Sequence, residues 1–365
     1  MLTFRNNTPL GMVYVMTNSA EGNQIAAFRR HPNGDLTFVD LYETHGMGTG
    51  TREISSATPE DGIDTLASQG SIALSSDKHY LFAVNAGSNN ISSFRVDYNG
   101  ELIFADIIPS GGLQPNSLDV YNNLLYVANA GSPENNFSSN ITGFYVENNG
   151  TFNTIPVSTH SLSTPNAQPA RVLFSPDGSQ LIVSELTTSR LNIFEVNSNG
   201  TLSELYVNAS NGAGPFGSYF TRSGLLLVAE AGENAVSSYR PTQSGELAVI
   251  SGSAGNGQMA TCWVVSTPNG AYAYTSNAGN GTISVYRINR NGTLSILTSL
   301  YSTLDAMAAP IDNGVSGDGQ YFYVLNGNKG TISVFRIENN GNLSYRQSVG
   351  CDRLPQLGAQ GLVIY

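Results

Sequence analysis

The stretch that decides the fold is residues 262–297, which read CWVVSTPNGAYAYTSNAGNGTISVYRINRNGTLSIL. It holds four apolar or alternating runs separated by turn-forming residues: 262–266, 271–277, 282–288 and 293–297. Runs of this length with a period of two predict short β-strands, and no helical period lies between them. The dipeptide Asn291-Gly292 favours a tight hairpin, because both central residues of such a turn need positive φ. The stretch therefore predicts one four-stranded antiparallel sheet.

The same unit recurs along the whole chain, with a period of about fifty residues. Its marker is a glycine that lies six residues after an aromatic residue of the preceding strand. The seven marker glycines are Gly34, Gly100, Gly150, Gly200, Gly245, Gly292 and Gly341. The aromatic residues before them are Phe28, Phe94, Phe144, Phe194, Tyr239, Tyr286 and Phe335. Seven such units predict an all-β fold, a seven-bladed β-propeller.

Both ends of the chain carry an incomplete unit. Residues Val13–Asn18 resemble a second strand that lacks a first, and Gln360–Tyr365 resemble a first strand without partners. We expect the C-terminal strand to complete the N-terminal blade, because this pairing closes the ring and removes open sheet edges. Blades are not separable domains, so residues 1–365 are expected to form a single domain.

The composition limits the partners and the compartment. A net charge of −11 argues against nucleic acid, which needs a basic footprint, and no apolar run is long enough to span a membrane. Asn-x-Ser/Thr triplets are frequent, and either hairpin turns or glycosylation explains them. No signal peptide is visible, but the lysine-poor surface favours an extracellular protein, with a cytoplasmic one as the alternative. Cys262 and Cys351 are interpreted as buried free thiols.

Candidate site residues gather on one face of the predicted ring. The loops that lead into the first strands and those that join second to third strands share this face, here called the top face. Second strands end in Asn in five units, but in Glu185 and Glu230 in two adjacent ones, and Arg171 lies near the first of these. A repeat often breaks its own rule for function. We therefore predict Arg171, Glu185 and Glu230 as catalytic residues, and as substrate-binding residues Gln69, Gln114, Gln168, Asp312, Asn277 and Asn326.

A structural interpretation of the same residues stays open. Arg171 and Glu185 flank the turn at Ser175–Gly178, so they are expected to face each other across a hairpin as a cross-strand pair. The recurrent Asn is explained as a turn former, because Asn accepts left-handed geometry. The four histidines lack metal-ligand spacing, so no metal and no cofactor is expected. The long connector at residues 45–69 is expected over the top face, either as a lid or as an ordered loop.

The repeat phrase SxDGxxLxVxNxGxNxIsxFrvxxnGxL, as in Ser75–Leu102, Ser175–Leu202 and Ser316–Leu343, resembles the lactonase family of seven-bladed propellers. That family includes propeller-type 6-phosphogluconolactonases and fungal carboxymuconate cyclases. The resemblance implies a site at one mouth of the central channel, where Arg, Glu and His act on a lactone or its hydroxy acid. Its Pro-Arg-His segment falls on 169–172, with Arg171 displaced by one position and the His absent.

Two functions follow from this resemblance and from the residues. The first is an enzyme that hydrolyses or forms a lactone of a small anionic hydroxy acid. In it, Glu185 or Glu230 transfers the proton in place of the His, and Arg171 binds a carboxylate. The second is a non-catalytic extracellular propeller that binds glycans or proteins, or associates with itself. The missing His favours the second function, and the Arg and Glu cluster favours the first.

Overall fold

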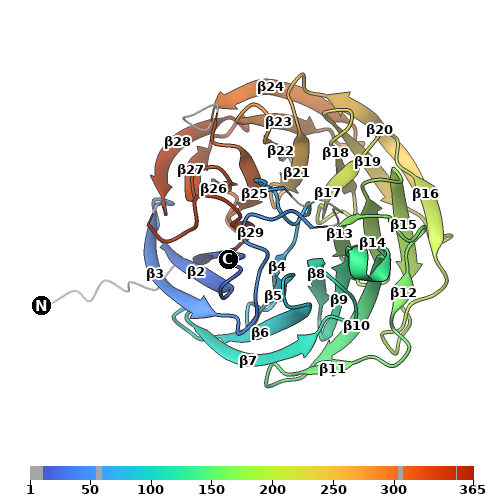
Figure 1. Ribbon diagram of the computed structural model, residues 1–365. Coiled ribbons are helices and arrows are strands. Elements are labelled where there is room, and N and C mark those ends of the chain that lie inside the picture. Colours follow the sequence, from blue (N-terminus) through green and yellow to red (C-terminus); the bar gives the residue numbers. More distant parts are fainter. Residues whose placement is uncertain (1–10, 55–59, 303–306, 351) are drawn as a thin grey trace, which may run out of the picture.

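The computed structural model describes residues 11–54, 60–302, 307–350 and 352–365. Seven antiparallel sheets surround a central axis like the blades of a propeller (Figure 1). From the axis outward, blade 1 contains β29 (Gln360–Ile364), β1 (Met12–Met16), β2 (Gln24–Arg30) and β3 (Leu36–Glu43). Blade 2 contains β4 (Ile72–Leu74), β5 (Tyr80–Asn85), β6 (Asn90–Val96) and β7 (Leu102–Pro109). Blade 3 contains β8 (Pro115–Tyr121), β9 (Leu124–Asn129), β10 (Asn140–Val146) and β11 (Phe152–Thr154), and the short β12 (His160–Ser161) also pairs with β10. The predicted all-β, seven-bladed architecture is confirmed.

Blades 4 to 7 follow the same order. Their strands are β13 (Pro169–Phe174), β14 (Gln180–Glu185), β15 (Arg190–Glu195) and β16 (Tyr206–Ala209); β17 (Pro215–Phe220), β18 (Leu226–Glu230), β19 (Ala235–Pro241) and β20 (Leu247–Gly255); β21 (Thr261–Ser266), β22 (Tyr272–Asn277), β23 (Thr282–Ile288) and β24 (Leu294–Ser302); β25 (Pro310–Val315), β26 (Tyr321–Asn326), β27 (Thr331–Ile337) and β28 (Leu343–Val349). A short 3₁₀ turn, η1 (Pro133–Asn135), leads into β10. No helix in the described ranges is long and apolar enough to cross a membrane.

The marker residues of the repeat hold the blades to one another. Each of the seven aromatic residues is 2% exposed or less, because it packs between neighbouring blades. Each marker glycine has a positive φ, and its carbonyl accepts a hydrogen bond from a side chain of the preceding blade. The seven donors, in blade order, are Tyr14, Ser93, Tyr126, Asn208, Ser238, Tyr274 and Tyr323. The sequence period is thus also the period of the contacts between blades.

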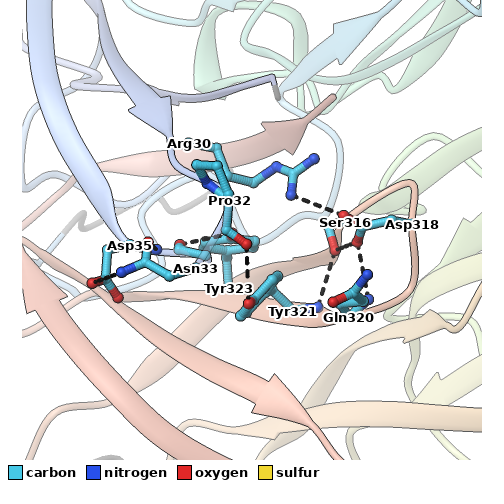
Figure 2. A network of polar contacts seen from close by, with 10 residues as sticks. Arg30, Pro32, Asn33, Asp35, Ser316, Asp318, Gln320, Tyr321 and Tyr323 are labelled. Carbon is cyan, nitrogen blue, oxygen red and sulfur yellow. Dashed lines mark hydrogen bonds and ion pairs between the residues drawn. The ribbon is translucent and has the colours of Figure 1, made fainter. Parts of the chain in front are cut away.

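The ring closes where the prediction placed the closure. Residues Val13 and Val15 of β1 pair with Ile364 and Leu362 of β29, so the last strand of the chain completes the first blade. Blades 7 and 1 are also joined by an ion pair, in which Arg30 of β2 lies 3.1 Å from Asp318 in the β25–β26 hairpin (Figure 2). Both closures make the N-terminal and C-terminal blades neighbours.

The connector between blades 1 and 2 crosses the central channel. Residues 63–70, here called the plug segment, run across the centre of the ring in Figure 1 before the chain reaches β4. The indole of Trp263 in blade 6 donates to the Ser68 carbonyl at 3.0 Å. On other sides of the ring, Ala170 of blade 4 accepts from the Gln69 N–H at 2.9 Å, and Gln360 of blade 1 donates to the Ile63 carbonyl at 3.1 Å. These bonds fit the ordered-loop interpretation of the connector. Residues 55–59, in its middle, lie outside the described ranges.

Candidate functional site

A polar cavity of about 240 Å³ lies in the central channel, below the plug segment. The first strands of all seven blades line it, and Gln69 and Gly70 of the plug segment form one end. The lining then extends to Lys78, which follows β4, and to Val315 at the carboxyl end of β25, so the cavity reaches toward the face opposite the plug. We call this the bottom face; it carries the hairpins that join first to second and third to fourth strands. The channel therefore offers one polar chamber with its interior functional groups on β8, β13 and β25.

Arg171 of β13 supplies a positive charge in the interior of this cavity. Its side chain is 13% exposed, and its Nη2 lies 4.0 Å from an oxygen of Asp119 on β8. Its Nη1 donates to the carbonyl of Gln69 at 3.3 Å. Gly70 has a φ of +86°, and a Cβ there would lie 1.3 Å from the Arg171 Nη1, so a larger residue would displace the guanidinium or the plug. The close approach of Gly70 thus fixes the guanidinium beside the plug.

Asp312 of β25 is the carboxyl group with the most useful proton affinity. It is 3% exposed, and burial raises its pKa to about 7. Hydrogen bonds from the backbone N–H groups of Gly361 and Gly70, together with the charge of Arg171, oppose that rise. A group with this pKa both accepts and donates a proton near neutral pH. Burial also raises the pKa of Asp119, and the charge of Arg171 lowers it again.

Several polar atoms around this cavity lack a partner within the described residues. They are buried and comprise the Gln69 Oε1, the Arg171 Nε and the Asn313 Oδ1. Buried polar groups in folded proteins are nearly always hydrogen-bonded. Two acceptors and one cationic donor around one cavity are therefore suited to a small polar ligand that carries hydroxyl groups and a negative charge.

The predicted catalytic residue Glu185 lies elsewhere, at the end of β14. Its carboxylate is fully buried and accepts hydrogen bonds from the Ser163 N–H at 2.9 Å and the Thr188 hydroxyl at 2.5 Å. The Asn192 amide and the Ser163 hydroxyl also donate to it. All of these partners belong to the same region of blade 4, and Glu185 is not among the residues that line the cavity.

Glu230, at the end of β18, has an equivalent environment in blade 5. It accepts from the Gly212 N–H at 2.9 Å, the Ser237 hydroxyl at 2.5 Å and the Ser253 hydroxyl at 2.6 Å. It is fully buried and does not line the cavity either. Both glutamates therefore hold their own blades together by local hydrogen bonds.

The expected Arg171–Glu185 pair across the hairpin is wrong. A β-bulge shifts the register between Pro169 and Arg171, so Pro169 lies opposite Glu185 and Arg171 lies opposite Ser184. A bulge re-aims the side chains of a strand, which a count of residues from the turn does not anticipate. Arg171 consequently contacts Asp119 of the neighbouring blade.

The other predicted binding residues divide into two groups. Gln69 and Asp312 line the cavity with Arg171. Asn277 and Asn326 end second strands, and each donates to the residues five and seven positions later in its own blade. Gln114 and Gln168 lie just before β8 and β13 with positive φ, in the loops that turn into these strands. The structure thus brings together Gln69, Arg171 and Asp312, and leaves the remaining predicted residues outside the cavity.

A protein-family model identifies the group to which this propeller belongs. The model described as "Lactonase, 7-bladed beta-propeller" matches residues 42–134, 134–265 and 249–352. The chain belongs to this lactonase family. A search of curated proteins finds no match.

Solved structures similar to this family member share its fold over nearly their whole length. A candidate 6-phosphogluconolactonase from Bacteroides fragilis has 18% identity and a TM-score of 0.74, covering 99% of each chain. A periplasmic gluconolactonase from Pseudomonas aeruginosa has 17% identity and a TM-score of 0.74, covering 97% of this chain and 98% of its own. A hypothetical selenium-binding protein from Sulfolobus tokodaii has a TM-score of 0.70 at 10% identity, covering 99% of this chain and 94% of its own. At these identities the likeness shows the fold alone.

Sequence reasoning missed several cavity residues of this lactonase-family chain, namely Lys78, Asp119, Tyr219 and Asn313. A usable signal was present in the first strands, which line the channel of a propeller. Arg171 and Asp312 each follow the first proline of their strand by two positions, and Asp119 and Tyr219 by four. Polar residues at matching positions of first strands therefore identify the cavity better than the ends of second strands do.

The sequence interpretation of Cys262 holds for the part of the chain that is described. Its thiol is free and buried, and burial raises its pKa. Cys351 lies outside the described residues. A buried thiol with a raised pKa is inert as a nucleophile, so Cys262 adds packing rather than chemistry.

Proposed function

We propose that this lactonase-family protein is an enzyme that opens or closes the lactone ring of a small anionic hydroxy acid in the channel cavity. The observation that carries the proposal is the buried Asp312, with a pKa of about 7, in the same cavity as Arg171. The volume of about 240 Å³ suits a small molecule and not a polymer. Two similar structures, a candidate 6-phosphogluconolactonase and a periplasmic gluconolactonase, support the same substrate class.

The reaction assigns one role to each of these side chains. In the hydrolytic direction, ionised Asp312 accepts a proton from the water that attacks the lactone carbonyl. As the ring C–O bond breaks, Asp312 returns this proton to the departing ring oxygen, so the product is a hydroxy acid and the Asp312 carboxylate is regenerated. Arg171 binds the anionic group of the substrate and then the new carboxylate, because a guanidinium matches a carboxylate in geometry and charge. Ring closure is the same path in reverse.

This assignment departs from the proton transfer that the sequence placed on Glu185 or Glu230. Each of these carboxylates accepts at least three hydrogen bonds from its own blade, so little capacity is left for a substrate. The two glutamates therefore provide a matched control for Asp312. All three groups are buried acids near the axis side of a blade, and only Asp312 lines the cavity.

The experiment is a panel of aldonolactones and phosphorylated aldonolactones, assayed with the wild type and four variants. Asp312→Asn keeps an oxygen for the Gly361 N–H but cannot accept the proton, and a loss of about 10²- to 10⁴-fold in kcat is expected. Arg171→Gln should mainly raise KM. Glu185→Gln and Glu230→Gln should leave kcat within about threefold of wild type. Loss of turnover in the glutamate variants, with full activity in Asp312→Asn, would return proton transfer to the glutamates.

We also propose that the protein works outside the cytoplasm. The lysine-poor composition supports this location, and one similar structure is described as periplasmic. Expression of the full-length natural gene followed by fractionation of its host tests the location. Recovery of the protein only in the cytoplasm would contradict it. Glycan binding and self-association stay predictions of the second, non-catalytic hypothesis.

A further inference from the structure

A groove of about 580 Å³ on the bottom face, between blades 5 and 6, gathers three arginines. Arg222 comes from the β17–β18 hairpin, Arg240 from the end of β19, and Arg290 from the turn between β23 and β24. The remaining lining residues are neutral, and they include Ser223 and Asn269. All three guanidinium groups belong to exposed residues. We call this surface the basic groove.

The basic groove is unusual because the protein as a whole is acidic. The chain has 16 basic residues and a net charge of −11, so acidic partners for arginines are plentiful. Other arginines use them: Arg30 pairs with Asp318, and Arg171 lies beside Asp119. Among the described residues, none forms an ion pair with an arginine of the basic groove. The fold therefore does not neutralise these three charges.

The fold does not need these arginines either. Within the described residues, the only hydrogen bond from one of their side chains is a long one, from the Arg240 Nη1 to the Ser223 carbonyl at 3.5 Å. Exposed side chains that make so little contact with the protein contribute almost nothing to folding stability. These side chains are therefore available to a molecule outside the chain.

The chain's own repeats show that Arg222 breaks the pattern, whereas Arg240 recurs as Arg95, Arg287 and Arg336. Where blade 5 has Arg222, the equivalent hairpins of the other blades with this turn have Ser76, Pro176, Pro268 and Gly317. The next position, Ser223, is Asp77, Asp177, Asn269 and Asp318 in those hairpins. That Asp or Asn normally accepts a hydrogen bond from the Ser or Thr that opens the turn. The blade 5 hairpin has thus lost an acid and gained a base.

We propose that the basic groove binds a ligand that carries phosphate or sulfate groups. A guanidinium donates two parallel hydrogen bonds to such an oxyanion, and Ser223, Asn269 and Asn289 add neutral donors along the same groove. Three positive charges suit a doubly charged phosphate ester or a chain with several sulfates better than a single carboxylate. This site is separate from Asp312 and Arg171, and the proposal does not rest on the lactonase activity.

The basic groove lies close to the wall of the channel cavity, on the bottom face. Tyr219 lines the cavity; burial raises its pKa, and the charges of Arg222 and Arg171 both lower it. A ligand held in the basic groove would therefore lie beside the channel. It would not occupy it.

The test measures binding of two probes by isothermal titration calorimetry: glucose 6-phosphate, and a heparin-derived tetrasaccharide with several sulfates. The variant is Arg222→Ala/Arg240→Ala/Arg290→Ala. The matched control is Arg95→Ala/Arg287→Ala/Arg336→Ala, which removes the same charge from exposed strand positions equivalent to Arg240 that do not line the groove. Circular dichroism checks that both variants fold.

We expect at least one probe to bind the wild type saturably and at least tenfold more weakly to the groove variant, with less than a twofold change in the control. Binding should weaken as salt is raised, because exposed charges are screened. Loss of glucose 6-phosphate binding identifies a small phosphate ester as the ligand class, and loss of only the tetrasaccharide identifies a sulfated glycan. The absence of saturable binding of either probe to the wild type, or an equal loss in both variants, overturns the proposal.

Discussion

Two sets of buried carboxylates in this propeller look alike in sequence and differ in environment. Glu185 and Glu230 end second strands, where hydroxyl, amide and N–H donors of their own blades surround them. Asp312 lies in a first strand, where two backbone N–H groups are its main donors and a cavity lies beside it. The difference teaches that a departure from a repeat is not by itself a site. What decides is whether the departing group is left with unused bonding capacity.

The largest expected effect that separates the two sets is the dependence of stability on pH. The pKa of Asp312 is raised to about 7 in the folded protein, from 3.8. The folded state therefore binds this proton more tightly, and the contribution is complete below pH 4 and lost as pH rises through 7. A pKa difference of about three corresponds to roughly 4 kcal/mol at most, at 1.36 kcal/mol for each pKa step.

Urea unfolding at pH 5 and pH 8 measures this contribution. The free energy of unfolding of the wild type should fall toward pH 8, and that of Asp312→Asn should fall less. Activity should move the opposite way, rising through pH 7, because the ionised form of Asp312 accepts the proton. Parallel stability profiles for the two proteins would mean that Asp312 does not titrate in this range.

The glutamates should be next in size, and their effect should be on stability alone. Glu185→Ala removes the acceptor for Asn192, Ser163 and Thr188, and leaves these donors unpaired inside blade 4. We expect a loss of about 2–4 kcal/mol in the free energy of unfolding. Glu185→Gln keeps one oxygen and should lose less than half as much. Thermal and urea unfolding measure both, and a kcat that fell while stability held would contradict the structural role.

The smallest expected effect concerns the plug segment beside Arg171. Gly70→Ala puts a Cβ against the guanidinium at a φ of +86°, so the side chain or the plug must shift. A residue with Cβ at this φ costs about 1–2 kcal/mol. We expect KM for an anionic lactone to rise, with a smaller change in kcat. Gly224→Ala, which has φ +77° and open space around it, provides the control for backbone strain alone.

The sequence was sufficient to predict the fold because the residues that repeat along the chain are also the residues that make the contacts between blades. The marker glycine accepts a hydrogen bond from the preceding blade, and the aromatic residue six positions before it is buried in the packing of the blades. The pairing of Val13 with Ile364 follows from one incomplete unit at each end. The repeated strand pattern and the pairing of the two chain ends predict the same ring of blades, so one sequence is enough to predict the architecture.

The site was less readable because it depends on departures from regular geometry. The bulge at Pro169–Arg171 turns Arg171 into the channel, and no residue count from the Ser175–Gly178 turn foresees it. The approach of Asp312 to Gly70 joins residues far apart in sequence through the plug segment. Gln69, Arg171 and Asp312 were nevertheless among the predicted residues, because loops that lead into first strands converge on the axis.

The plug segment crosses the central channel and bounds the chamber at one end. Trp263 and Gln360 hold it from two sides of the ring, through hydrogen bonds to Ser68 and Ile63, and the chamber extends from it toward the bottom face. In the function proposed above, lactone and hydroxy acid occupy the same chamber, so we expect an accumulated hydroxy acid to compete with fresh lactone for it.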